Sequence, residues 1–174
     1  YELSKENKEL IPKTIKHIFI ISDRRERIET LRKIAKAVNS DKTMIFINTK
    51  YDLEESLQKL QYHNYNVAAL AGNIDKQSKK KAVEDFQNGR LQYLLATDVA
   101  ARGLQIDHVS TVINVNLPEE PTEYLHRAGR CGRNNEQGLC ISIITENELN
   151  KIKKYQKAFN INIVQKRLYN GKIV

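Results

Sequence analysis

The chain has 174 residues, of which 40% are hydrophobic and 29% are charged, the profile of one soluble globular domain. Its net charge of +8, from 29 Lys plus Arg against 21 Asp plus Glu, favours an anionic partner, either nucleic acid or a membrane surface. No apolar run approaches the roughly 20 residues that span a bilayer. No basic amphipathic helix carries Trp or Phe on its apolar face, so we expect no membrane partner.

The expected elements alternate along the chain, strand-length apolar runs being followed by stretches of helical period. The expected strands are 17–21, 43–47, 67–70, 93–96, 111–115 and 139–144, and the expected helices are 23–38, 51–62, 75–89, one after Pro121, and 146–159. This order predicts an α/β fold in a single domain over residues 1–174, with a parallel sheet and helices on both faces. Ligands of such sheets bind at the carboxyl ends of the strands.

The two ends of the chain and its cysteines suggest further expectations. No signal-peptide pattern opens the chain, and the start at Tyr1, without a methionine, is interpreted as a cut inside a longer protein. We expect residues 163–174 to begin an extension. Cys131 and Cys140 form no Cys-x-x-Cys pair, which suits a reducing compartment and predicts a cytoplasmic protein.

A complete phosphate-binding loop is absent from the sequence. The pattern G-x-x-x-x-G-K-S/T is not met, because the pair Gly171-Lys172 has Lys166 at the first glycine position and Ile173 at the hydroxyl position. A G-x-G-x-x-G pattern is also missing, which argues against a dinucleotide-binding enzyme. No residues have metal-ligand spacing, so we expect no metal site. If ATP chemistry is involved, this chain holds only part of the site.

The run His126-Arg-Ala-Gly-Arg-Cys-Gly-Arg133 carries the strongest chemical signal. If its first half is helical, His126, Arg130 and Arg133 share one face, where the two arginines repel each other unless an anion lies between them. Gly129 and Gly132 allow another backbone or a phosphate to approach closely. Guanidinium groups bind phosphate oxygens in a bidentate fork. The alternative is a solvated basic loop.

Three further segments lie where ligands are expected. Ala96-Thr-Asp-Val-Ala-Ala-Arg-Gly-Leu104 follows a strand, and Thr97 or Asp98 can cap a helix. The segment 44–50 places Thr49 at another strand end, and Leu70-Ala-Gly72 precedes the lysine-rich run 76–81. Ordinary helix caps and a solvated lysine face are the alternatives.

These segments resemble those of one family, the DEAD-box RNA helicases. Residues 96–104 resemble motif V, residues 126–133 resemble motif VI, H-R-x-G-R-x-G-R, and residues 44–50 resemble motif IV. The resemblance covers nearly the whole chain, in order, and the leading His-Arg of motif VI points to the DEAD-box group. It implies a RecA-like fold, namely the C-terminal of the two RecA-like domains of such a helicase.

The resemblance also implies roles around the nucleotide. Arg130 and Arg133 are similar to arginine fingers that reach ATP and Mg²⁺ held mainly by an N-terminal RecA-like domain, and are therefore the expected catalytic residues. His126 and Arg127 are similar to residues that link the two domains. Gly103 is expected near the nucleotide. The family usually has Asp where this chain has Gln105, so the contact to the ATP ribose is in doubt.

A second set of implied roles concerns RNA. Thr49, Gly72 and Thr97 are similar to contacts with the RNA sugar–phosphate backbone, which position RNA without reading its sequence. The family's Q-x-x-R element corresponds here to Gln77-Ser-Lys-Lys80, with Lys80 replacing Arg. The usual His before Gly72 is replaced by Ala, which again weakens the expected grip on RNA.

Two functions remain open on the sequence. The first is half of an enzyme that unwinds or remodels RNA with ATP, its site shared between two domains and the isolated chain inactive. The second is a RecA-like module that binds RNA or a protein without ATP turnover. The intact pair Arg130 and Arg133 favours the enzyme.

Overall fold

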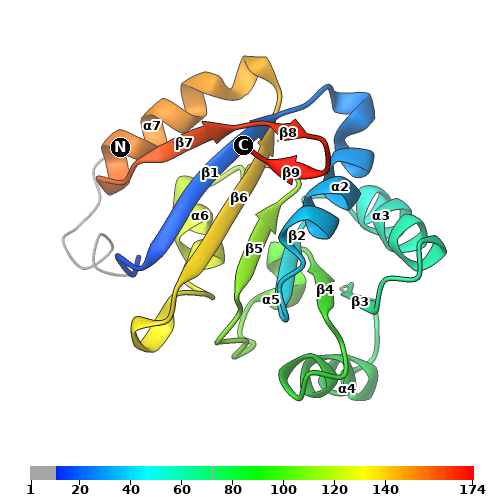
Figure 1. Ribbon diagram of the computed structural model, residues 1–174. Helices are drawn as coiled ribbons and strands as arrows, with labels where there is room; N and C mark the ends of the chain where they lie inside the picture. Colours follow the sequence, from blue (N-terminus) through cyan, green and yellow to red (C-terminus); the bar gives the residue numbers. More distant parts are fainter. Residues whose placement is uncertain (1–10, 72) are drawn as a thin grey trace.

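The computed structural model describes residues 11–71 and 73–174. Its centre is a parallel sheet of seven strands in the order β3-β4-β2-β5-β6-β1-β7 (Figure 1). The strands are β1 (Ile15–Ile21), β2 (Thr43–Phe46), β3 (Val67–Leu70), β4 (Tyr93–Ala96), β5 (Thr111–Asn114), β6 (Gly138–Ile144) and β7 (Ile163–Lys166).

Helices cover both faces of the sheet, as expected from the sequence. They are η1 (Arg24–Glu26), α2 (Arg27–Val38), α3 (Lys50–Tyr62), α4 (Lys76–Gln87), α5 (Asp98–Ala101), α6 (Pro121–Ala128), η2 (Arg133–Asn135), η3 (Glu146–Glu148) and α7 (Leu149–Phe159). Leu31 of α2 and Leu53 of α3 belong to one buried apolar cluster, whereas Phe86, Leu125 and Ile152 of α4, α6 and α7 belong to the other. The sheet separates the two clusters.

Strand β2 shows how the pattern of side chains divides the core. Met44 and Phe46 belong to the cluster under α4–α7, and Ile45 belongs to the cluster under α2 and α3. Successive side chains of a strand point to opposite faces, so a wholly apolar strand is stable only when both faces are covered. The near-continuous apolar strands of this sequence therefore required the two helical layers that the structure has.

The C-terminal segment differs from the extension expected there. Strand β7 pairs in parallel with β1, and a small antiparallel hairpin follows, formed by β8 (Leu168–Tyr169) and β9 (Lys172–Ile173). Leu168 and Ile173 pack against the cluster under α2 and α3. Only the first residue of β7 is buried, as is typical of an edge strand, so its sequence lacks the apolar run that marked the other strands.

Cys131 and Cys140 form no disulfide, and both are buried. Burial raises the pKa of Cys131 to about 12 and that of Cys140 to about 11, so both thiols stay protonated at neutral pH. Over the described part of the chain, no helix combines the length and the apolar character that crossing a bilayer requires.

Candidate functional site

The carboxyl ends of β2 and β4 place two threonines at one edge of the sheet. Thr49 caps α3 by accepting a hydrogen bond from the Asp52 amide at 3.2 Å, and Thr97 caps α5 by accepting one from the Ala100 amide at 3.2 Å. Because β2 and β4 are neighbours in a parallel sheet, both caps lie at the edge where the strands end. Each helix start leaves backbone N–H groups free to meet an anion.

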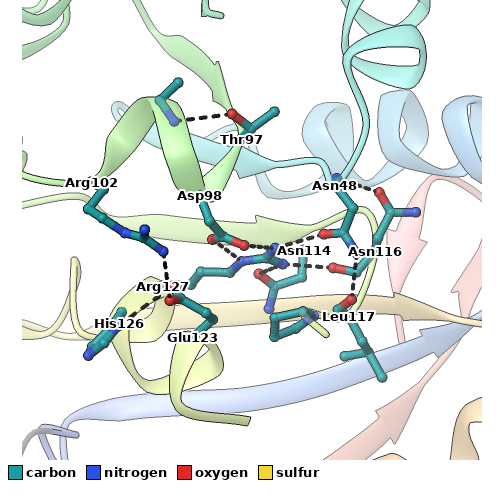
Figure 2. A network of polar contacts seen from close by, with 12 residues as sticks. Asn48, Thr97, Asp98, Arg102, Asn114, Asn116, Leu117, Glu123, His126 and Arg127 are labelled. Carbon is teal, nitrogen blue, oxygen red and sulfur yellow. Dashed lines mark hydrogen bonds and ion pairs between the residues drawn. The ribbon is translucent and has the colours of Figure 1, made fainter. Parts of the chain in front are cut away.

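Arg127 of α6 organises the ends of the central strands (Figure 2). Its Nε and Nη2 donate to the two carboxylate oxygens of Asp98 at 2.8 and 2.7 Å. The same guanidinium donates to Asn48 Oδ1 at 2.8 Å, to Asn114 Oδ1 at 3.3 Å and to the Asn116 carbonyl at 2.8 Å. Arg127 therefore fastens together the segments that follow β2, β4 and β5.

This arrangement differs from the interdomain contact expected of Arg127. The Arg127 side chain is 1% exposed, and its guanidinium lies 5.1 Å from the centre of the Phe46 ring. A guanidinium group is costly to bury unless its N–H groups are hydrogen-bonded. Asp98 and the amide side chains meet that requirement from inside the domain, so Arg127 holds this domain together.

A pocket of about 360 Å³ opens beside this network. Its lining includes four residues expected near a nucleotide or a second domain, namely Gly103, His126, Arg130 and the buried Arg127, and it also includes Asp98. Gly103 has a φ of +80°, a backbone conformation that side-chain-bearing residues rarely adopt. The structure thus brings together residues from the segment after β4 and from the end of α6.

Glu123 carries the negative charge on the α6 side of this pocket (Figure 2). Its carboxylate lies 3.5 Å from Arg102 Nη2 and 3.6 Å from His126 Nδ1. Arg102 and His126 are 70% and 58% exposed, and so both can exchange Glu123 for another anion at little cost.

The arginines of residues 126–133 do not share one helical face. Helix α6 ends at Ala128, so Arg130 and Arg133 lie beyond it. Arg130 lines the pocket and donates to the carbonyls of Leu104 at 2.7 Å and Ala101 at 3.3 Å. Burial lowers the pKa of Arg130 from its ordinary value, but a guanidinium stays charged at neutral pH.

Arg133 lies in the exposed turn η2, and its Nε donates to the Gly129 carbonyl at 2.8 Å. Arg133 is not part of the pocket lining. The exposed side chain can reach toward a partner that faces this surface. Of the two arginines, Arg130 is therefore the one already set in the pocket.

Gly132 is closely approached by side chains, whereas the sequence predicted the approach of another backbone or a phosphate at the glycines of this segment. Its φ is +69°, and a Cβ at this position would lie 2.5 Å from Ile15 Cγ1 and 2.9 Å from Thr14 Oγ1. Thr14 Oγ1 also donates to the Gly132 carbonyl at 2.7 Å. The neighbour that requires glycine here is the start of β1, not a phosphate.

The remaining predicted contacts lie outside the pocket. Gln105 is exposed, and its carbonyl accepts a hydrogen bond from Gln87 at 2.9 Å. Gln77 and Lys80 are exposed on α4, which begins just after β3, and Lys80 lies 4.0 Å from Glu84. Gly72 lies outside the described residues.

Sequence reasoning missed the amides that orient Arg127. Asn114 is fully buried in β5 and also donates to Ser142 Oγ at 3.1 Å, while Asn116 Oδ1 accepts from the Asn48 amide at 2.9 Å. A buried Asn within the apolar run 111–115 was a usable signal, since buried polar groups need partners. Within residues 11–71 and 73–174, no group of three His, Cys, Asp or Glu residues is arranged to hold a metal ion.

Comparison with known proteins identifies the family. The model of the helicase conserved C-terminal domain matches residues 26–135. The DEAD-box ATP-dependent RNA helicase CshC of Bacillus cereus is 34% identical over 160 residues, which cover 92% of this chain and 41% of CshC. The ATP-dependent RNA helicase FAL1 of Eremothecium gossypii is 36% identical over 150 residues, 86% of this chain and 38% of FAL1. The chain thus spans about two fifths of these relatives.

Solved structures agree with the sequence relatives. The C-terminal domain of the DEAD-box protein Dbp5 superposes with a TM-score of 0.83 at 29% identity, covering 88% of this chain and 91% of that one. S. cerevisiae Dbp5 bound to RNA and ADP BeF3 superposes with a TM-score of 0.85 at 28% identity, covering 95% of this chain and 44% of that one.

The seven-stranded parallel sheet with helices on both faces is a RecA-like fold, which confirms the expected fold class. The chain belongs to the helicase conserved C-terminal domain family, as the C-terminal domain of a DEAD-box RNA helicase.

Proposed function

We propose that this domain supplies Arg130 and Arg133 as arginine fingers to an ATP site shared with an N-terminal RecA-like domain. Arg130 is already in place, and Arg133 reaches the site when the two domains close on each other. ATP and Mg²⁺ are bound mainly by that second domain, and the cycle drives local unwinding or remodelling of RNA. The isolated chain is then inactive, because it lacks a phosphate-binding loop and the carboxylates that hold Mg²⁺. An intracellular, cytoplasmic setting fits the reduced cysteines.

The position of Arg130 carries this proposal. Its guanidinium lines a pocket together with Gly103 and His126, and two backbone carbonyls hold its Nη atoms. A guanidinium held in place before the reaction can stabilise negative charge on a transferring phosphoryl group without reorganising. Partial burial strengthens that interaction, since the local dielectric is lower than in water.

Closure of the two domains would replace the local partners of the exposed residues. His126 and Arg102 exchange Glu123 for groups of the other domain or for phosphate oxygens, and Arg133 swings from its turn toward the nucleotide. Arg127 does not move in this scheme. It keeps the segments after β2, β4 and β5 in register, so that residues facing ATP and residues facing RNA move as one body.

RNA is proposed to run along the carboxyl edge of the sheet. Thr49 and Thr97 begin helices there, and backbone N–H groups at helix starts suit phosphate oxygens. Gln77 and Lys80 on α4 would flank the same path. Such contacts bind the backbone and do not select a base sequence.

The test is RNA-stimulated ATP hydrolysis by the full-length protein. Arg130→Ala should lower kcat by about 10³–10⁵, and Arg130→Lys should restore little, because lysine lacks the fork. Arg90→Ala is the matched control, an exposed arginine paired with Asp85 outside the pocket. A loss of less than tenfold for Arg130→Ala would overturn the catalytic role.

A second candidate function is supported by Gln105. This residue stands at the position where the family usually has an Asp, and its side chain is exposed and lies outside the pocket. In that case the domain binds RNA or a protein, and ATP turnover has been lost. Full-length protein that binds RNA but releases no phosphate above background would favour this module over the enzyme.

A further inference from the structure

A second pocket, of about 310 Å³, lies on the face of the sheet that α2 and α3 cover. One wall is formed by the basic residues Arg32, Lys33 and Lys36 of α2, and the other by residues 168–171 of the β8–β9 hairpin. Figure 1 shows this hairpin beside α2, with α3 on the far side of that helix. None of the motif residues discussed above lines this pocket.

The hairpin forms a fixed wall. Leu168 and Ile173 pack against the apolar cluster under α2 and α3, and the backbones of Arg167 and Val174 exchange two hydrogen bonds, at 2.9 and 2.8 Å. Asn170 and Gly171 form its turn with φ values of 50° and 74°, the Asn-Gly combination typical of a two-residue hairpin loop. The opening of the pocket is therefore shaped before any ligand arrives.

The charge of the pocket is only partly balanced. Arg32 is bonded to Glu29, whose carboxylate also lies 2.7 Å from Lys59. Throughout residues 11–71 and 73–174, no carboxylate lies within ion-pair distance of Lys33 or Lys36. Two ammonium groups one turn apart repel each other, and so an anion between them would relieve that repulsion.

An exposed aromatic ring completes the pocket. Tyr169 is 67% exposed although it is a large hydrophobic residue. Aromatic side chains beside a basic groove are the feature by which proteins bind single-stranded nucleic acid, because the ring stacks on a base while the cations meet the phosphates. An acidic peptide would meet the lysines but would leave the ring without a stacking partner.

From this combination we infer that the pocket between α2 and the hairpin is an auxiliary RNA contact. Lys33 and Lys36 bind a backbone phosphate, and Tyr169 stacks on an adjacent base of a single-stranded segment. The inference rests on the proposed function in one respect, that the protein acts on RNA. It adds a contact away from Thr49 and Thr97, on the face covered by α2 and α3, for RNA that extends beyond the sheet edge.

The experiment measures binding of a labelled single-stranded oligouridine to the 174-residue chain by fluorescence anisotropy across a salt series. Lys33→Ala combined with Lys36→Ala should weaken binding and reduce the slope of log K against log salt by about 0.7, the value for the one phosphate of a single strand that the two lysines share. The matched control removes Lys151 and Lys154, two exposed lysines with the same spacing on α7, on the opposite face. That control should leave the slope unchanged.

Substitution of the ring separates stacking from charge. Tyr169→Ala should weaken binding about tenfold without changing the salt slope, and Tyr169→Phe should bind as the unaltered chain does. Thermal unfolding checks that each variant is folded. If removal of Lys151 and Lys154 lowered RNA affinity as much as removal of Lys33 and Lys36, the inference would be overturned, because RNA would then be attracted unspecifically to any basic surface. Competition by polyglutamate that is as strong as competition by unlabelled RNA would also overturn it.

The outcome separates this inference from the proposed function. If variants of Thr49 or Thr97 weaken RNA binding while those of Lys33, Lys36 and Tyr169 do not, the auxiliary contact is wrong and the proposed function stands. If the unaltered chain and the full-length protein bind no RNA, both fail.

Discussion

Asp98 and Arg127 form a bidentate ion pair across 29 residues of sequence, with N–O distances of 2.8 and 2.7 Å. Asp98 belongs to the segment that follows β4, and Arg127 belongs to α6 (Figure 2). The pair therefore connects the two segments that the sequence marks most strongly. Because Arg127 also binds Asn48, the segment after β2 is drawn into the same network.

The first prediction concerns this pair. Arg127→Met should lower the free energy of unfolding of the isolated chain by about 3–5 kcal/mol, because removing one partner of a buried ion pair leaves the other uncompensated. Urea unfolding measures the change. The control is Arg102→Met, whose side chain is 70% exposed and pairs with Glu123 at 3.5 Å, and should change stability by less than about 1 kcal/mol. An unaltered midpoint for Arg127→Met would show that the network contributes no stability.

The second prediction concerns Gly132. Replacement by Ala forces a positive φ on a side-chain-bearing residue, which costs about 1–2 kcal/mol, and drives a Cβ into Ile15, which costs about 1–3 kcal/mol more. Gly89→Ala isolates the first of these costs, because Gly89 has a φ of +81° and no atom within 4 Å of a Cβ. Unfolding by denaturant should give a lower free energy of unfolding for Gly132→Ala than for Gly89→Ala. Equal losses of unfolding free energy in the two variants would mean that the start of β1 shifts to accept the Cβ at no cost in stability.

The third prediction concerns pH. Burial lowers the pKa of His17 to about 4 from 6.5, and its Nδ1 lies 2.8 Å from the Tyr124 hydroxyl. Between these two pH values the unfolded chain binds the proton and the folded chain does not. The free energy of unfolding should therefore fall as pH falls from 6.5 to 4, by up to about 3 kcal/mol, and His17 adds no pH dependence above 6.5.

His17→Asn tests this pH dependence. Asn does not titrate, so the variant should lose that part of the pH dependence, while His63→Asn, at an exposed position, should keep it. Unfolding by urea at several pH values gives both curves. Parallel curves for His17→Asn and the unaltered chain would contradict the buried neutral state of His17.

The sequence predicted the sheet better than the site. Apolar runs located six of the seven strands, because buried parallel strands are apolar on both faces. Strand β7 was missed, since an edge strand with one buried residue carries no such pattern. Arg127, Arg130 and Arg133 are chemically alike in the sequence. Only the folded chain shows that Arg127 is buried, that Arg130 is held in the pocket and that Arg133 is exposed. That distinction depends on where α6 ends and on the amides that meet Arg127.

The last prediction concerns Lys80 and RNA. Lys80 is 79% exposed on α4, and its Nζ lies 4.0 Å from Glu84 Oε1. Such a solvent-exposed ion pair is weak and leaves the Lys80 side chain free to bind another anion. If Lys80 binds a phosphate of RNA at the sheet edge, Lys80→Ala should reduce the slope of log K against log salt by about 0.7 for a single strand. Lys80→Arg should tighten binding, because a guanidinium fork holds a phosphate more rigidly than an ammonium does.

Lys81→Ala is the matched control for Lys80, since Lys81 is an exposed lysine one position along the same helix and points in another direction. Fluorescence anisotropy on a short labelled RNA should give a smaller slope for Lys80→Ala than for Lys81→Ala, and equal weakening across base sequences, as phosphate contacts require. If the two variants share one slope and one affinity, the lysines of α4 form a solvated face and Lys80 is not part of the RNA path. The RNA path would then rest on the helix starts at Thr49 and Thr97, whose backbone N–H groups need no lysine to meet a phosphate.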